Sequence, residues 1–283
     1  MTDSLMPPAG TDLPALERLA LDVARRCGRL IVDERPGDLG VAATKTSRTD
    51  VVTVMDRRSE ALARELLAAA RPEDGFHGEE AGRVTTRSGI TWVVDPIDGT
   101  VNYLYGIPAY AVSVAAVVGA PDVPGAWRPV AGAVVEPVTG EAHVAHLGGG
   151  ARLVTGAGER TLAVPAADDL GAALLATGFG YEASVRAEQG RVIAEVLPRV
   201  RDIRRRGSAA LDLCWVADGR VDAYFERGLH EWDLAGGWIV VTEAGGTVRG
   251  LGDRPPADPV TIAGPAGLAD GLDAVLRRVV DQR

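Results

Sequence analysis

The sequence predicts an α+β fold in which an antiparallel-rich sheet in the first half is followed by an α/β region in the second. Three observations lead to this class: apolar residues recur at helical spacing near the start, alternating apolar runs separated by Gly/Pro turns follow, and helices and strands then alternate after Pro165. The chain has 283 residues, of which 46% are hydrophobic and 24% charged. These values are typical of a globular protein that buries most of its surface.

The first elements follow from periodicity and from chain breakers. Residues 1–11 are rich in Pro and Gly, and we expect a mobile tail there. Helical spacing predicts helices over 13–34 and 57–70. Residues 73–82 (EDGFHGEEAG) are predicted to form a polar turn, and 90–94 (ITWVV) a short strand that ends at the next aspartate.

Strands dominate the middle of the chain and mixed elements its end. We expect strands of one sheet at 109–118, 130–135 and 141–147, with further strands within 151–164. The later elements are predicted in this order: helix 186–197, strand 201–204, helix 208–218, strand 221–225, helix 233–244, further strands, and a last helix at 266–282. Residues 12–283 are therefore expected to form one unit, with an α+β subdomain at about 12–165 and an α/β subdomain at about 166–283.

Charge and cysteine content exclude several classes of protein. The formal net charge of −9 gives no overall attraction for nucleic acid or for an anionic membrane. The two cysteines, Cys27 and Cys214, are too few for a disulfide framework, and we expect both to be buried thiols. The N-terminal residues lack the pattern of a signal peptide, and no apolar run reaches the roughly eighteen residues of a membrane span. A cytoplasmic protein is expected.

The segment with the strongest chemical signal is Trp92–Thr100 (WVVDPIDGT). An apolar strand brings Asp95 to its C-terminal edge, and Pro96 is expected to prevent the strand from continuing. Asp98 follows one turn later, so the two carboxylates can converge on one point. The two amides after Asp98 are free to meet an anion if a helix begins there. Paired carboxylates suit Mg²⁺, although a strand ended by an Asx turn is an equal alternative for this motif alone.

Three further acidic segments accompany this motif. Glu79 and Glu80 lie in the predicted polar turn, where a glutamate pair is usually solvated. Asp233 stands at a predicted helix start, and Asp56 stands at the entry to the second helix. For both aspartates an N-cap is the default structural interpretation.

Taken in order, these segments resemble the inositol monophosphatase family of Mg²⁺-dependent, lithium-sensitive phosphatases. The resemblance covers about residues 13–250 and rests on TDVVTVMD, HGEE, WVVDPIDGTVNYLYGIP, LLATGFGY, GSAALDLCWVADGRVDAYFERG and HEWDLAGGWIVVTEAGG. It implies the layered α/β/α/β/α sandwich of the inositol monophosphatase and fructose-1,6-bisphosphatase type. It also implies a homodimer and hydrolysis of a small phosphorylated polyol or sugar, foremost myo-inositol monophosphate.

The resemblance assigns metal ligands residue by residue. Glu79, Asp95 and the carbonyl of Ile97 would hold one Mg²⁺. Asp95, Asp98 and Asp233 would hold a second, and Glu79 would contribute to a third. Two ions about 3.5–4 Å apart can clamp the attacking and leaving oxygens of a phosphate ester. No histidine or cysteine is positioned as a nucleophile, so direct attack by water is the expected mechanism.

The resemblance also assigns residues to the water and the substrate. Thr100, oriented by Asp56, would position and help to deprotonate the attacking water. The residues implied in binding phosphate or substrate are Gly99, Thr100, Gly207, Ser208, Ala209 and Glu226, with Lys45 and Ser184 as further candidates.

Other polar residues are predicted to have no catalytic role. His143 and His146 would point to opposite faces of a strand, which argues against a shared metal. His77 and His230 are expected to support the site or lie at the surface, and Arg204–Arg206 to form a solvated or subunit-contact cluster.

Alternative functions on the same fold remain open. The substrate could instead be histidinol phosphate, fructose 1,6-bisphosphate, NADP or adenosine 3′,5′-bisphosphate, because the metal motifs do not discriminate among them. A regulatory protein-binding module with secondary phosphatase activity is a further alternative, since some bacterial relatives act in RNA-polymerase-associated regulation.

Overall fold

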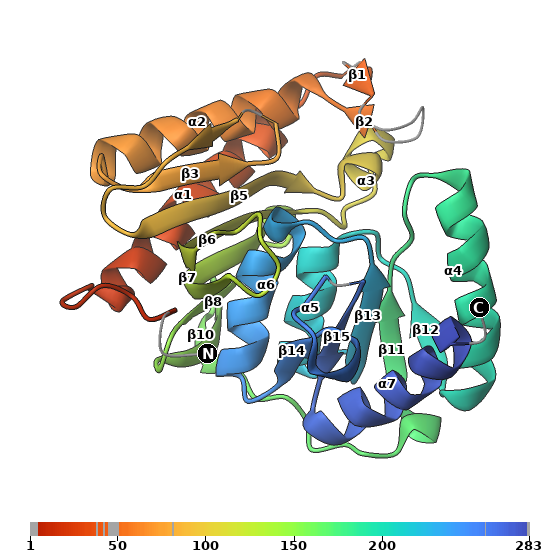
Figure 1. The fold of residues 1–283 in the computed structure, drawn as a ribbon. Coiled ribbons are helices and arrows are strands. Elements are labelled where there is room, and N and C mark those ends of the chain that lie inside the picture. The colour runs from red at the N-terminus through yellow and green to blue at the C-terminus, as the bar shows by residue number, and fades with distance from the viewer. Residues whose placement is uncertain are drawn as a thin grey trace.

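The computed structural model describes residues 5–37, 39–41, 43–44, 51–80, 82–257 and 259–281, and these form alternating layers of helices and sheets (Figure 1). The helices are α1 Leu13–Asp33, α2 Val54–Ala70, α3 Thr100–Tyr105, α4 Ala183–Val196, α5 Ala209–Asp218, α6 Glu231–Glu243 and α7 Ala266–Asp281. The strands are β1 Ala43–Thr44, β2 Val51–Val52, β3 Gly75–Gly78, β4 Arg83–Val84, β5 Ile90–Asp98, β6 Ala111–Gly119, β7 Trp127–Glu136, β8 Glu141–His146, β9 Gly150–Thr155, β10 Gly158–Thr161, β11 Leu174–Thr177, β12 Asp202–Arg204, β13 Ala223–Arg227, β14 Thr247–Arg249 and β15 Val260–Gly264.

The larger sheet has the strand order β10-β9-β8-β7-β6-β5-β3-β4 and is antiparallel except where β3 runs parallel to β5. Helices α1 and α2 cover one face of it, because apolar residues such as Leu16 and Val23 of α1 pack on the sheet in one buried cluster. The predicted strands of the middle of the chain therefore do belong to one sheet.

The smaller sheet has the order β12-β11-β13-β15-β14 and mixes parallel with antiparallel pairs. Helices α5 and α6 lie between the two sheets, where they share the largest described core cluster, and α4 and α7 cover the outer face of the smaller sheet (Figure 1). The expected α/β/α/β/α sandwich is confirmed. The larger sheet ends at Thr161 and the smaller one begins at Leu174, on either side of Pro165; the division into two subdomains stays a prediction.

Two local predictions are wrong. Strand β5 does not stop before the aspartates but continues to Asp98, since the pairing with β6 shifts between Asp95 and Asp98 and this bulge accommodates Pro96. The polar turn predicted at 73–82 contains β3, whose Phe76 is 5% exposed and pairs with Trp92 of β5. Buried contacts outweigh the polar and glycine-rich composition of this segment.

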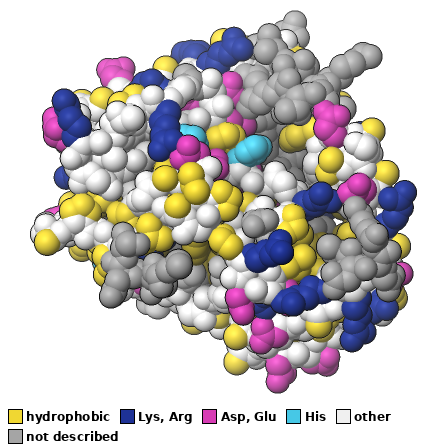
Figure 2. Space-filling model, in the orientation of Figure 1, with side chains coloured by type: hydrophobic (Ala, Val, Ile, Leu, Met, Phe, Trp, Pro, Cys, Tyr) yellow, Lys and Arg dark blue, Asp and Glu magenta, His cyan; other side chains and the backbone are white. Residues whose placement is uncertain are grey.

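The described part of the predicted N-terminal tail packs on the domain, since Leu5 joins the core cluster beneath α1 and α2. Cys27 and Cys214 are free and buried, as expected. None of the helices within the described ranges combines the length and the apolar character that crossing a bilayer requires. Acidic and basic side chains are interspersed on the face drawn in Figure 2 rather than gathered into one patch of a single sign.

Candidate metal and phosphate site

A cavity of about 330 Å³ opens where the bulged end of β5 meets the N-termini of α3, α5 and α6. It brings together most of the residues singled out from the sequence. Those lining it are Glu79, Asp95, Ile97, Asp98, Gly99, Thr100, Gly207, Ser208, Ala209, Glu226 and Asp233. These residues come from positions 79 to 233 of the chain, so the cavity exists only because the layers assemble.

Three carboxylates form the centre of the cavity. Asp95, Asp98 and Asp233 each offer an oxygen atom, and these atoms all lie within 4.8 Å of one another. Asp95 is 2% exposed and Asp98 7% exposed, so water screens their charges weakly. Glu79 lines the same cavity beside this group.

The N-terminus of α5 holds Asp98 in place. The Ser208 hydroxyl donates to its Oδ2 at 2.5 Å, and the backbone amides of Ala210 and Ala209 donate to its two oxygens at 2.7 and 3.3 Å. These donors and the helix dipole favour a negative charge at this position. Burial nevertheless raises the pKa of Asp98 to about 6, against the lowering effect of the hydrogen bonds from Ser208 and the two amides.

The sequence suggested that Asp233 is the N-cap of α6, but this residue lies in the first turn of the helix. The N-cap is His230, whose backbone amide donates to Asp233 Oδ2 at 2.7 Å in a capping box. Burial and the nearby negative charge of Asp98 raise the pKa of Asp233 well above its ordinary value. The same side chain thus caps a helix and faces the other carboxylates.

This donor set fits a divalent cation of the Mg²⁺ kind. All the central groups are hard oxygen donors. The backbone amide of Ile97 donates a hydrogen bond of 3.0 Å to Oδ1 of Asp95 and so holds this carboxylate in place. Asp98 and Asp233 are buried close enough to repel each other, which a cation between them would relieve.

Thr100 and Asp56 form a hydrogen-bonded pair next to this cluster. The Thr100 hydroxyl lies 3.1 Å from Asp56 Oδ1 and 3.1 Å from the carbonyl of Ile97. Asp56 is not an N-cap but the third residue of α2, and its Oδ2 accepts from both the amide and the hydroxyl of the N-cap Thr53 at 2.8 and 2.5 Å. Burial raises the pKa of Asp56, and the bonds from Thr53 oppose that rise.

Gly99 turns the chain from β5 into α3 with a φ of 98°, a conformation that favours glycine. A Cβ there would lie 3.0 Å from the carbonyl oxygen of Gly207 and 3.1 Å from that of Ala109. Only glycine therefore lets the β5–α3 turn pack against the segment that leads into α5.

Glu226 of β13 also lines the cavity and is partly buried beside Tyr224, whose hydroxyl donates to its Oε2 at 2.8 Å. Burial raises the pKa of Glu226 to about 7, although the Tyr224 bond lowers it. A Cβ on Gly178 would approach this carboxylate to 2.0 Å, so glycine at 178 makes room for it. At neutral pH Glu226 can accept or donate a hydrogen bond to a substrate hydroxyl.

Among the described residues, the predicted contact Ser184 does not line the cavity. Ser184 is exposed on the first turn of α4, whereas its neighbours Tyr181, Glu182 and Val185 line the cavity. Lys45 lies outside the described residues.

Asp212 also lines the cavity and was missed, and Arg205, expected in a solvated or subunit-contact cluster, lines it as well. Asp212 is 1% exposed, its Oδ1 has no hydrogen-bond partner among the described residues, and burial raises its pKa well above the ordinary value. Its position four residues after Ser208 puts both on one face of α5, which is the signal that could have found it. No comparable periodicity marks Arg205.

The histidines and arginines set aside from the sequence have structural partners. His146 lies 2.6 Å from Glu17 of α1, while His143 lies on the other side of the sheet near Asp218, so they do not share a ligand. His230 stacks on Trp232 at the cavity wall, with ring centroids 4.7 Å apart. The three arginines do not form one solvated cluster, because Arg206 turns inward and pairs with Glu136.

A layered fold in which three carboxylates converge near the N-termini of its central helices is able to hold a divalent cation. The sequence profile of the inositol monophosphatase family matches residues 12–280. The chain belongs to the inositol monophosphatase family.

Relatives and solved structures agree with this assignment. The chain is 46% identical over 245 residues to the inositol-1-monophosphatase SuhB of Mycobacterium tuberculosis, covering 84% of this chain and 82% of that protein. It is 45% identical over 274 residues to the inositol-1-monophosphatase of Mycobacterium leprae, covering 93% and 92%. The solved structure of Mycobacterium tuberculosis SuhB superposes with a TM-score of 0.80, at 40% identity over 95% of this chain and 98% of the other. A Nus factor SuhB of Xylella fastidiosa is 38% identical, covering 81% and 82%.

Proposed function

We propose that this protein is a phosphoric monoester hydrolase that converts myo-inositol monophosphate to myo-inositol and phosphate in the presence of Mg²⁺. The observation that carries the proposal is the group of buried Asp95 and Asp98 and partly buried Asp233, with oxygen atoms within 4.8 Å of one another, in a chain of the inositol monophosphatase family. Inositol-1-monophosphatases at 45% and 46% identity support this substrate.

Two to three Mg²⁺ ions would be held by Glu79, Asp95, Asp98, Asp233 and the carbonyl oxygen of Ile97. When bound, the ions supply the positive charge that lets a phosphate dianion approach these carboxylates and that stabilises the charge developing in displacement. The protein contributes the fixed geometry, because β5 and the N-termini of α5 and α6 hold the metal-ligating carboxylates in place before the substrate binds.

The Thr100–Asp56 pair provides the route for a proton. A water molecule that attacks phosphorus gives its proton to Thr100 Oγ1, while Thr100 passes its own proton to Asp56 Oδ1, 3.1 Å away. Burial raises the pKa of Asp56, which makes this carboxylate a better acceptor than an exposed aspartate. No phosphoenzyme is formed in this scheme, since water is the nucleophile.

The remaining cavity residues recognise the phosphate and the polyol. The amides of Gly99 and Thr100 face the phosphate oxygens, and Gly207, Ser208 and Ala209 form the adjoining wall. Glu226 binds ring hydroxyls. Lys45 stays a predicted contact.

A phosphate-release assay with myo-inositol 1-phosphate and titrated Mg²⁺ tests the proposal. We expect Mg²⁺-dependent turnover that is lost in Asp98→Asn. The absence of Mg²⁺-dependent turnover, or full activity of Asp98→Asn, contradicts it. Histidinol phosphate, fructose 1,6-bisphosphate, NADP and adenosine 3′,5′-bisphosphate belong in the same panel, and a higher kcat/KM for one of them would replace inositol phosphate as the substrate.

A second candidate function is a regulatory interaction with other proteins, which the 38% identity to a Nus factor SuhB favours. Recovery of transcription proteins with an Asp233→Asn variant would support a role independent of catalysis. We also propose that the protein is a cytoplasmic homodimer. It is expected to make no direct contact with nucleic acid, and its net charge of −9 supports this last expectation.

A further inference from the structure

Arg206 and Glu136 form a buried ion pair directly behind the carboxylate site. Arg206 precedes α5, and Glu136 is the last residue of β7 in the larger sheet. The Nη2 of Arg206 lies 3.1 Å from Oε1 of Glu136, and the two side chains are 13% and 5% exposed. Arg206 therefore points away from solvent and away from the cavity, which it does not line.

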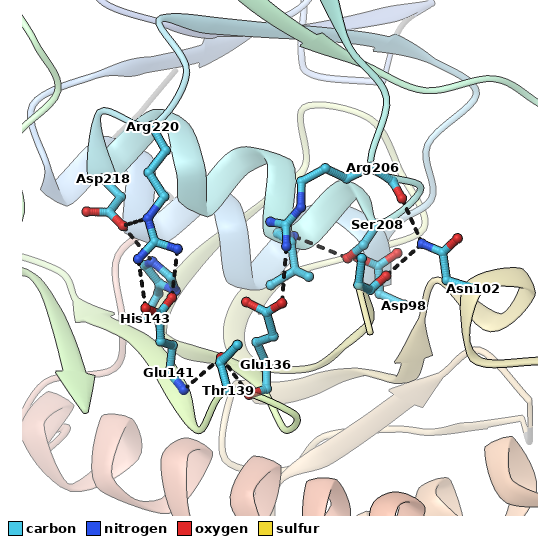
Figure 3. Close-up of polar contacts among 12 residues, drawn as sticks. Asp98, Asn102, Glu136, Thr139, Glu141, His143, Arg206, Ser208, Asp218 and Arg220 are labelled. Carbon is cyan, nitrogen blue, oxygen red and sulfur yellow. Dashed lines mark hydrogen bonds and ion pairs between the residues drawn. The ribbon is translucent and has the colours of Figure 1, made fainter. Parts of the chain in front are cut away.

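Other contacts hold Arg206 at both its ends. Its guanidinium lies 3.6 Å from the ring centroid of Trp215, a residue of α5. Its backbone carbonyl accepts a hydrogen bond from Asn102 Nδ2 at 2.7 Å, and the same amide group donates to Ala109 at 2.7 Å. Figure 3 shows the side chain reaching to Glu136 while the backbone meets Asn102.

The segment fixed in this way is the one that holds Asp98. Ser208, two residues after Arg206, donates to Asp98 at 2.5 Å, and the next two amides complete the contacts. A shift of this segment would move all three donors together. A buried ion pair adds little net stability compared with apolar packing. Its role here is therefore to fix the position of the N-terminus of α5.

We propose that Arg206 and Glu136 are positioning residues for the metal site, because they set the place of the α5 N-terminus that orients the Asp98 carboxylate. This inference rests on the proposed function, in which Asp98 is a metal ligand. Arg206 acts through Ser208 and its neighbouring amides and does not contact the phosphate.

The chain contains a matched control at the other end of the same helix. Arg220, just after α5, binds Glu141 at the start of β8 through two hydrogen bonds of 2.7 and 2.8 Å. This pair also connects α5 to the larger sheet. Among the described residues, neither Arg220 nor Glu141 contacts Asp98 or its donors, and the pair lies at the far end of the helix in Figure 3. Because Arg220 also pairs with Asp218, its replacement reports how the loss of ion pairs at the far end of α5 affects the fold.

The experiment measures the affinity of the metal-free, full-length protein for Mg²⁺ by titration calorimetry. We expect Arg206→Gln and Glu136→Gln each to weaken Mg²⁺ binding about ten- to hundredfold, the usual effect of removing groups that orient metal ligands. The double variant should be no weaker than the weaker single variant, because one pair is removed in each case. Arg220→Gln should stay within about twofold of the parent protein.

Kinetics separate positioning from substrate attraction. In Arg206→Gln and Glu136→Gln, the Mg²⁺ concentration for half-maximal activity should rise with the loss of affinity. The KM for inositol 1-phosphate at saturating Mg²⁺ should stay within about twofold of the parent value. Arg206→Lys should recover part of the Mg²⁺ affinity. A raised KM with unchanged Mg²⁺ affinity would make Arg206 a substrate-attracting residue and would overturn the inference. Equal losses in Arg220→Gln would overturn it as well, since the effect would then be one of general stability.

Two further variants keep the outcomes distinct. Glu136→Gln retains the shape and a hydrogen-bond acceptor, so it carries the test if Arg206→Gln does not fold. Asp98→Asn is the reference: unchanged Mg²⁺ affinity in this variant would contradict the proposed ligand set itself. Lost affinity in Asp98→Asn with normal affinity in Arg206→Gln and Glu136→Gln would overturn only the positioning role.

Discussion

Buried carboxylates gather at both ends of α5, but arginines pair with them at only one end. At the C-terminal end, Asp218 is fully buried, its Oδ2 lies 2.6 Å from Arg220 Nε, and its Oδ1 contacts Arg160. At the N-terminal end, Asp98 binds a hydroxyl and two amides, and Asp233 a single amide. Neither Asp98 nor Asp233 makes an ion pair with an arginine of the described residues.

The difference separates a structural cluster from a functional one. A charge removed from water needs an opposite charge, and the protein provides it for Asp218 within the fold. At the other end, the negative charges accumulate: burial raises the pKa of both Asp98 and Asp233, and the charge of Asp98 raises the pKa of Asp233 further. That end fits the cation site that we propose.

The largest expected effect is at the N-terminal end. Asp233→Asn should lower kcat/KM for inositol 1-phosphate by about a thousandfold or more, since a metal clamp contributes several kcal/mol to the transition state. The metal-free variant should unfold at the same or a higher denaturant concentration, because one of the repelling carboxylates is gone. Glu231→Gln, two residues earlier and ion-paired with His77 at 3.5 Å, is the control with near-normal kcat/KM. A metal-free Asp233→Asn protein that is clearly less stable would break the comparison.

The next effect concerns His143 at the C-terminal end. Burial, with the nearby charge of Arg220, lowers the pKa of His143 to about 4, although Asp218 Oδ2 lies 3.7 Å from its Nε2. The unfolded chain takes up this proton near pH 6.5, so stabilisation is complete above that pH and is lost as the pH falls toward 4. The loss should reach about 3 kcal/mol.

Chemical denaturation between pH 7 and pH 4 measures the His143 effect. His143→Gln should lack this part of the acid destabilisation, so the free energies of unfolding of parent and variant should converge at low pH. Parallel pH curves for the two proteins would show that His143 does not remain neutral in the folded state.

A smaller effect is expected for Asp218→Asn. The substitution leaves two arginines without their buried partner, and since Arg220 and Arg160 are partly exposed, the loss of unfolding free energy should be about 2 kcal/mol. Mg²⁺ affinity and kcat/KM at saturating Mg²⁺ should change less than about threefold. Urea denaturation measures the free energy of unfolding, and the phosphate assay measures the activity. A large loss of Mg²⁺ affinity would show that the two ends of α5 are coupled.

The smallest effect should come from Arg160→Gln. The Arg160 side chain is 52% exposed, so its contact with Asp218 is screened by solvent and should be worth less than about 1 kcal/mol. The same urea experiment checks this value. A loss equal to that of Asp218→Asn would mean that Arg160, rather than Arg220, neutralises the buried carboxylate.

Local sequence determined several parts of the site. Asp95, Asp98 and the Gly99 turn lie within five residues of one another, so their common placement follows from a strand end and a tight turn. The same logic found the starts of most helices but misplaced Asp56 and Asp233 by three positions, since the third residue of a capping box and an N-cap look alike in sequence.

Other features required partners that are distant in the chain. Strand β3 was taken for a turn because its pairing with β5 and the burial of Phe76 are tertiary facts. Arg206 looked solvated because Glu136, seventy residues earlier, is its partner. Asp212 is buried because α5 lies between the two sheets, and this position depends on tertiary packing.

The sequence by itself determined the family, the order of the elements, and the carboxylates that are candidates for binding metal, because these depend on periodicity and on short motifs. Only the tertiary structure decided which charges are neutralised within the protein. Asp218 meets arginines and Asp98 meets amides and Asp233, although all are acidic residues near the ends of one helix. The physical reason is that a buried charge is defined by its neighbours in space, which a linear pattern does not contain.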